Sequence, residues 1–302
     1  MKKLVIFGSI GIDDIKTPFG RQKNVLGGSA IYASICASYF ASNFSIALVS
    51  AVGEDFPEKY FQTLKKKNID ISNLTKNGKT FRWQGEYKYD MNEAQTIKTC
   101  LNCLEAFNPN ISEQHKNSEY VFLANNDPDL QLKVLKQFTL PKVVLIDTMN
   151  YWIDKKYTSL VKVINKSNIL LLNEQEARQL YKTPNLIKAG HLALQMGPEF
   201  VIIKKGEHGS LLFSHRGFFS APAYPLEDLV DPTGAGDSFA GSLIGYLAKT
   251  SDASESNIRR AIIYGSSIAS FCTEDFSINK LTNISFKDIQ ERYNIFNKIR
   301  EF

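Results

Sequence analysis

Short runs of apolar residues, separated by stretches with helical periodicity, constrain the fold of this chain more than any other feature. The clearest runs lie at residues 4–7, 45–52, 120–125, 142–147 and 168–173. Strands that are buried on both faces of a parallel sheet have such nearly continuous apolar sequences. Helical patterns, as at residues 56–67 and 130–138, supply the crossovers that parallel strands require. We therefore predict an α/β fold.

Residues 231–241, with the sequence DPTGAGDSFAG, begin as a turn and continue as a helix. Pro232 restricts the backbone, and Gly234 and Gly236 permit conformations and close approaches that a Cβ would hinder. Apolar residues at helical spacing follow Asp237. The first amides of a helix have no intrahelical partner, and the helix dipole favours negative charge there. This pattern predicts an anion site beside a candidate general base, although Asp237 alone could simply suit the dipole.

Two other polar positions follow predicted strands. Asp13 comes shortly after the first strand, and Asn150 comes after the strand at residues 142–147. Ligands of open α/β sheets bind at the carboxyl ends of the strands, so both side chains are candidates for ligand contacts. The alternatives are a solvated loop residue for Asp13 and a turn former for Asn150. The pair Gly27-Gly28, which opens a helix of small residues, allows close approach of a ligand to the backbone.

The DPTGAGDSF motif and the Gly27-Gly28 turn together resemble the two signatures of the ribokinase-like (PfkB) carbohydrate and nucleoside kinases. The resemblance implies a three-layer α/β/α sandwich with a mainly parallel central sheet and a small β-sheet lid. It also implies one kinase domain over residues 1–302, with lid segments at about 14–26 and 79–104. Alternating and aromatic residues predict two strands in the second segment, at 80–89 and 95–101.

The family resemblance implies ATP-dependent phosphorylation of a primary hydroxyl. The chain has no Gly-x-x-x-x-Gly-Lys-Ser/Thr loop, so the phosphate site is expected at the helix start. Asp237 would act as general base, and the amides of Gly234, Ala235 and Gly236 would stabilise the anionic transition state. A sugar is the first choice of substrate, and a purine nucleoside such as adenosine or inosine is the alternative. A third hypothesis is a regulator that binds sugar or nucleotide without catalysis.

The nucleoside alternative depends on aromatic residues of the predicted lid, which could form a wall for a base. These residues are Phe81, Trp83, Tyr87 and Tyr89. Base–aromatic stacking contributes about 1–3 kcal/mol. Trp83 could equally pack within the lid.

The resemblance also implies roles for further residues. The expected substrate contacts are Asp13, Gly27, Gly28, Arg82 and Asn150. The expected contacts with ATP are Asn173, Lys204, Gly206 and Thr233. Glu176, in an Asn-x-x-Glu motif with Asn173, would hold Mg²⁺ through water, and Asp231 is a candidate ligand of a monovalent cation such as K⁺. Asn173 and Glu176 could instead, or in addition, cap the following helix.

Composition narrows the choice of partners and location. The net charge of +5 is spread along the chain, so we expect no nucleic-acid partner. No apolar stretch reaches the length of a membrane span, and the first apolar run stops at Gly8, as expected for a strand rather than a signal peptide. Cys100 and Cys103 have the spacing of half a zinc site, but no second pair accompanies them. We expect a cytoplasmic protein, with a homodimer through the lid strands as a candidate assembly.

Overall fold

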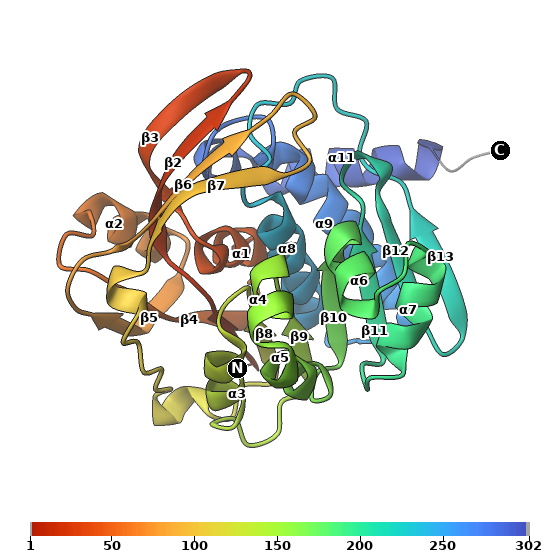
Figure 1. Ribbon diagram of the computed structural model, residues 1–302, viewed down its shortest axis with the longest axis horizontal. Coiled ribbons are helices and arrows are strands. Elements are labelled where there is room, and N and C mark those ends of the chain that lie inside the picture. Colours follow the sequence, from red (N-terminus) through yellow and green to blue (C-terminus); the bar gives the residue numbers. More distant parts are fainter. Residues whose placement is uncertain (1, 300–302) are drawn as a thin grey trace.

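The computed structural model describes residues 2–299, which form a large sheet between two layers of helices (Figure 1). Within these residues the large sheet has nine strands. Their spatial order is β13 (Gly217–Ala221), β12 (Ser210–Ser214), β11 (Phe200–Lys204), β10 (Ile169–Asn173), β9 (Val143–Ile146), β8 (Tyr120–Leu123), β1 (Lys2–Phe7), β4 (Phe44–Val52) and β5 (Ile69–Lys76). Pairing is parallel from β11 to β5 and antiparallel at β12 and β13.

Alternation along the strands divides the hydrophobic core between the two faces of the sheet. In β1, Leu4 and Ile6 belong to one core and Val5 and Phe7 to the other. Helices on the first face are α1 (Ser29–Ser38), α2 (Glu58–Lys66), α8 (Ala235–Thr250), α9 (Glu255–Cys272), α10 (Asn279–Asn283) and α11 (Phe286–Ile299). Helices on the second face are α3 (Pro128–Leu135), α4 (Asn150–Lys155), α5 (Tyr157–Ile164), α6 (Glu174–Tyr181) and α7 (Leu186–Leu194). Parallel strands are covered on both sides in this way because they are apolar on both sides.

A second, small sheet projects from one end of the large sheet, at the upper left of Figure 1. Its strands, in spatial order, are β3 (Gly20–Gly27), β2 (Gly11–Thr17), β6 (Phe81–Tyr87) and β7 (Ala94–Cys100). The β2–β3 and β6–β7 pairs are antiparallel, whereas β2 and β6 run parallel. A separate apolar cluster, with Ile15, Tyr87, Met91 and Phe276 buried in it, holds this sheet against the segment before α8.

The expected fold class is confirmed, and one local expectation changes. From the sequence, residues 69–74 are interpreted as a short connection after the helical pattern at 56–67. In the structure they belong to the edge strand β5, whose burial pattern lacks regular alternation. The sequence also predicts a terminal helix over residues 286–302. The structure describes this helix, α11, as far as Ile299, and residues 300–302 lie outside the described part. In residues 2–299, no helix is both long enough and apolar enough to cross a membrane.

Candidate active site

Helix α8 begins at a glycine that no other residue could replace easily. Gly234 caps the helix with φ of +77°, in the left-handed region. A Cβ at this position would come within 2.5 Å of the ring of Tyr32, which lies on α1. Both the backbone conformation and the ring therefore select glycine, and the turn delivers the first amides of α8 into the site.

Three amides at this helix start have no acceptor among the described residues: those of Gly234, Gly236 and Asp237. The amide of Ala235 differs, because it donates to the carbonyl of Pro232 at 3.1 Å. The expectation that Ala235 contributes a free amide is therefore wrong for this structure. Its place is taken by the amide of Asp237, one residue further into the first turn.

The carboxylate of Asp237 lies in the same turn and accepts no hydrogen bond from the described residues. Burial raises its pKa to about 7, with a further contribution from Asp147 that Lys204 partly opposes. A carboxylate with a pKa near neutrality and no protein partner can accept a proton from a bound hydroxyl.

An ion pair lies directly beside the helix start. The ammonium of Lys204, at the end of β11, contacts the carboxylate of Asp147 at 2.8 Å, and both side chains are largely buried. The same ammonium would lie 3.2 Å from a Cβ on Gly236. Burial lowers the pKa of Lys204, but Asp147 and Glu176 raise it by more, so the side chain stays charged. Lys204 thus adds a positive charge to the free amides.

Asp147 is a site residue that the sequence reasoning missed. It directly follows β9, and the position at the carboxyl end of a parallel strand was the available signal. The same reasoning selected Asn150, three residues later, instead. In the structure Asn150 begins α4, is exposed, and uses its backbone carbonyl to accept from Gln179. Its role in substrate binding remains a prediction.

Asn173 and Glu176 form a reciprocal capping box at the start of α6. The Asn173 side chain accepts from the Glu176 amide, and the Glu176 carboxylate accepts from the amide and side-chain nitrogen of Asn173 at 2.7 Å each. Burial and the charge of Asp147 raise the pKa of Glu176. The capping interpretation is confirmed, and the capped pair also lies within electrostatic reach of Asp237.

The charges of this cluster suit a bound cation. Asp147, Glu176 and Asp237 face one ammonium, Lys204, and the carboxylates raise the pKa of their neighbours. No three His, Cys, Asp or Glu side chains within residues 2–299 are arranged to ligate a metal directly. The oxygen donors of these carboxylates fit Mg²⁺, which keeps several waters and is usually bound through one or two carboxylates and substrate phosphates.

Asp13 lies across from this cluster, at the start of β2. Its carboxylate is buried over Gly27, where an added Cβ would lie 1.8 Å from Oδ2. Oδ1 is buried and has no hydrogen-bond partner. Burial raises the pKa of Asp13 to about 8, with contributions from Asp231, Asp14 and Asp237. An orphaned buried carboxylate oxygen requires a donor, which a substrate hydroxyl could supply.

Asp231 fastens the loop before α8. It is fully buried, and its carboxylate accepts from the amide of Thr233 at 2.9 Å and from that of Ser277 at 3.5 Å. The Thr233 hydroxyl in turn hydrogen-bonds the phenol of Tyr87 on β6, at 3.2 Å. The small sheet is thereby connected directly to the turn that begins α8.

Two more predicted residues lie further out. Arg82, on β6, is exposed and donates to the side chain of Asn24 at 2.8 Å. In the β2–β6 register, Arg82 immediately precedes Trp83, which pairs with Asp13. Gly206 begins a short 3-10 turn after β11, opposite the side chain of Asn92 from the small sheet. Within residues 2–299, no hydrogen bond or ion pair joins either of them to Asp237, and their ligand contacts remain predictions.

The four residues of the expected aromatic wall have different surroundings. Tyr89 is 86% exposed, Phe81 packs against Gly11, and Tyr87 is buried against the loop before α8. The indole of Trp83 folds over Gly85 and donates to Thr96. Phe81, Trp83 and Tyr87 share one face of β6, because residues separated by an even number of positions point to the same side of a strand, whereas Tyr89 lies beyond its end. A wall for a base at this face remains a prediction.

Comparison with known proteins assigns the chain to a family. The profile described as "pfkB family carbohydrate kinase" matches residues 1–282. The chain belongs to the pfkB family. It is therefore a phosphotransferase with an alcohol group as acceptor, and the family's activity is ATP-dependent phosphorylation of a sugar or nucleoside.

One relative agrees with this assignment, and two solved structures share the fold. A cytidine kinase from Thermococcus kodakarensis is 30% identical over 253 residues, which cover 82% of this chain and 88% of that protein. The crystal structure of a Methanocaldococcus jannaschii nucleoside kinase has a TM-score of 0.78 at 22% identity, covering 98% of this chain and 99% of the other. An E. coli protein of the ribokinase II type, solved with ATP and Mg²⁺, has a TM-score of 0.80 at 18% identity, covering 98% and 100%.

Proposed function

We propose that this protein is a nucleoside kinase that transfers the γ-phosphoryl group of ATP to a primary hydroxyl, with Asp237 as general base. The observation that carries the proposal is the unpartnered Asp237 carboxylate, next to the free amides of Gly234, Gly236 and Asp237 itself. A proton acceptor beside an anion hole is what phosphoryl transfer to a hydroxyl requires.

The reaction can be assigned to side chains of this chain. Asp237 takes the proton of the hydroxyl as its oxygen bonds to the γ-phosphorus. The bond between that phosphorus and the bridging oxygen breaks, and ADP leaves. The free amides and the Lys204 ammonium stabilise the negative charge on the transferred group. The Asp147 carboxylate, 2.8 Å from Lys204, keeps that ammonium beside Gly236.

Asp13 and the Gly27-Gly28 turn would hold the acceptor. The orphaned Oδ1 of Asp13 offers an acceptor for a sugar hydroxyl, and the absence of a Cβ on Gly27 leaves room for the carboxylate itself. The small sheet, connected through Tyr87 to Thr233, would exclude water from the reacting groups. Water would otherwise compete with the substrate for the phosphoryl group.

The proposed reaction also uses Mg²⁺, which would be held by carboxylates of the site. Glu176 and Asp147 are the residues that would hold Mg²⁺ through its waters. Mg²⁺ bound there would neutralise charge on the triphosphate. A monovalent cation near Asp231, a cytoplasmic location and a dimer through the small sheet stay predictions.

A nucleoside replaces a simple sugar as the first choice of substrate. Sequence reasoning favoured a sugar, with a purine nucleoside as the alternative. The 30% identity over most of the length of a cytidine kinase now supports a nucleoside. The aromatic wall stays a separate prediction and does not carry this argument, because Trp83 packs over Gly85 and Tyr87 packs against the loop before α8.

A substrate panel tests the proposal. We expect phosphorylation of at least one nucleoside with a kcat/KM about a hundredfold above that for ribose, because a site built around a base leaves polar groups unpaired when the base is absent. ADP release and ³¹P spectra of the product would measure turnover and the position of the new phosphate. A ribose kcat/KM equal to or above every nucleoside value would refute the nucleoside assignment, and binding without turnover of any compound would favour the regulator.

A further inference from the structure

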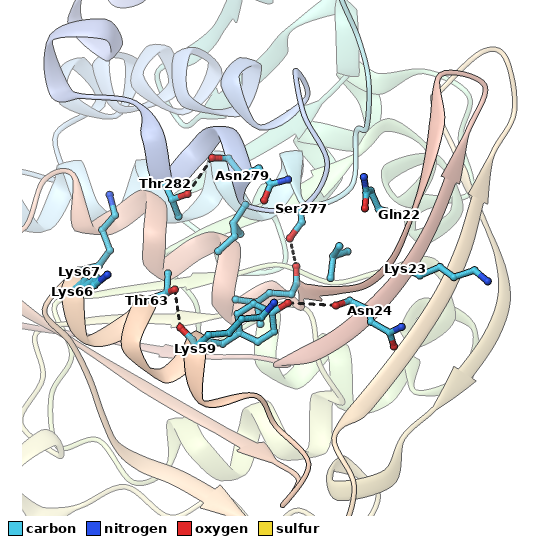
Figure 2. Close-up of a pocket in the computed structure, with 14 residues that line it drawn as sticks. Gln22, Lys23, Asn24, Lys59, Thr63, Lys66, Lys67, Ser277, Asn279 and Thr282 are labelled. Atoms are coloured by element: carbon cyan, nitrogen blue, oxygen red, sulfur yellow. Dashed lines mark hydrogen bonds between the residues drawn. The ribbon is translucent and has the colours of Figure 1, made fainter.

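A basic groove lies outside the active site, between the small sheet and α2. Its volume is about 610 Å³, within the range of small-molecule sites. It is lined by residues of three segments, 22–26 in β3, 59–67 in α2 and its C-cap, and 277–282 (Figure 2). Asp13, Gly27, Gly28 and Asp237 do not line it, so it is separate from the site described above.

The charge of the groove is one-sided. Four lysines line it, Lys23 from β3 and Lys59, Lys66 and Lys67 from α2, and no Asp or Glu does. None of the four forms an ion pair within residues 2–299. Lys59 lies over the ring of Tyr60, and Lys67 contacts the hydroxyl of Tyr39 at 3.2 Å. In Figure 2, Lys59, Lys66 and Lys67 lie on the α2 side of the groove, and Lys23 extends outward on the β3 side. Like charges without counter-charge raise the local concentration of anions.

Neutral hydrogen-bonding groups complete the lining. Figure 2 shows Ser277, Asn279 and Thr282 on one side of the groove and Asn24 on the other. Tyr60 donates to the carbonyl of Asn24 at 3.4 Å. Hydroxyls, amides and ammonium groups are the donors that phosphate oxygens accept from.

Size and charge together define the ligand. A groove of about 610 Å³ is larger than a single phosphate ion needs, and its four ammonium groups are distributed along α2 and β3. We propose that this groove is a second binding site, for a small molecule that carries a chain of two or more phosphoryl groups. The proposal is independent of which hydroxyl compound the active site phosphorylates.

The groove also lies close to the substrate side of the active site. Leu26, which lines it, directly precedes the Gly27-Gly28 turn. Ser277 donates its hydroxyl to the carbonyl of Leu26 and its amide to Asp231 at 3.5 Å. An occupant of the groove would therefore contact a segment that also supports Asp231 and the loop before α8.

Binding stoichiometry tests the proposal. ATP would be titrated calorimetrically into the full chain and into the groove variant Lys59→Gln/Lys66→Gln. The control variant, Lys133→Gln/Lys136→Gln, has the same change in charge at exposed lysines of α3 and its C-terminal end. We expect two ATP sites per chain in the parent and the control. In the groove variant the second site should weaken about tenfold or more, because charged hydrogen bonds to phosphate are lost. Unchanged thermal unfolding would show that the variants fold.

The other outcomes are equally decisive. One ATP site in all three proteins, or two unchanged sites in the groove variant, would overturn the proposal. Displacement of the second ATP by inorganic tripolyphosphate would show that the phosphate chain suffices, and its failure would show that the nucleoside part is also recognised. The groove would be assigned to nucleic acid if a single-stranded oligonucleotide bound the parent protein but not the groove variant, and if the parent protein had only one ATP site. That result would overturn the proposal of a small-molecule ligand.

Discussion

Two helix starts, those of α1 and α8, have similar sequences and opposite chemistry. Both follow a glycine with positive φ, +99° at Gly28 and +77° at Gly234. At α1, the amide of Ser29 donates to the Ser9 hydroxyl, that of Ala30 to the Ser9 carbonyl, and that of Ile31 to the Gly28 carbonyl. The amides of Gly234, Gly236 and Asp237 at α8 have no such acceptors among the described residues.

The difference shows that a glycine turn before a helix is an anion site only where the neighbouring chain leaves the amides free. At α1 the segment around Ser9 satisfies the amides, so the turn contributes its shape and the nearby Asp13 contributes the polar group. At α8 an acidic residue lies in the first turn and Lys204 lies beside it. We therefore assign acceptor binding to the first turn and phosphoryl chemistry to the second, and substitutions at each can test this division.

The largest effect is expected at Asp237. Asp237→Asn should lower kcat by about 10³-fold, because general-base catalysis contributes 10²–10⁴-fold. ATP affinity measured by calorimetry should change little. The matched control in α1 is Ser29→Ala, which removes the acceptor of the Ser9 amide and should cost about 1–3 kcal/mol of unfolding free energy with kcat within a few-fold of the parent. Similar kcat losses in both variants would contradict the division.

Asp147 is expected to act through Lys204. Asp147→Asn should lower kcat by roughly 10²-fold, because a loosely held ammonium stabilises the transition state less well. The substrate KM, measured in the same assays, should change less than kcat. Lys204→Met should produce a similar loss, and the double variant should lose little more, since both residues serve one interaction. If the losses of kcat were additive, the two residues would act independently, which would contradict a positioning role for Asp147.

A substitution of Asp13 tests whether the region of the α1 turn binds the hydroxyl substrate. Asp13→Asn should raise the KM of the substrate about 10- to 100-fold, the effect of losing one or two charged hydrogen bonds, with a smaller change in kcat. Steady-state kinetics at saturating ATP would measure both constants. A large fall in kcat with unchanged KM would place Asp13 in the chemical step and remove the division between the two turns.

The same carboxylates should make the stability of the unliganded protein depend on pH. Burial raises the folded-state pKa of Asp13 to about 8 and that of Asp237 to about 7, above the usual 3.8. Between these limits the folded state binds more protons than the unfolded state, so stability falls as pH rises from about 4 to about 8. Urea unfolding at pH 5 and pH 8 should show a smaller fall in Asp13→Asn than in the parent. An equal or larger fall in the variant would argue against a raised pKa.

The smallest effect is expected at Gly236. A Cβ there meets only the end of the flexible Lys204 side chain, at 3.2 Å, so Gly236→Ala should lower kcat a few-fold. Helix propensity should offset any loss of stability by up to about 1 kcal/mol. Gly28→Ala at α1 should instead destabilise the protein clearly, because φ is +99° and the Ser9 carbonyl oxygen would lie 2.5 Å away. Melting temperatures of the two variants would check this contrast.

Sequence patterns determined the features of this protein that depend on neighbouring residues. Continuous apolar runs such as residues 120–125 predicted buried parallel strands, and the DPTGAGDSF motif located the glycine turn, the helix start and Asp237. The Asn173–Glu176 capping box was also predictable, because its partners are three residues apart on one helical turn. Local spacing suffices where the interacting groups belong to the same element.

Only the tertiary structure decided which groups from different elements meet. Lys204 pairs with Asp147 across 57 positions of the sequence, and the Ala235 amide is occupied while that of Asp237 is free. Likewise, only the structure shows that Trp83 packs over Gly85 and that Tyr89 is exposed, and only the structure shows that Lys23 of β3 lines the same groove as the lysines at α2. These features follow from how strands and helices pack against one another, which spacing along one chain segment does not specify.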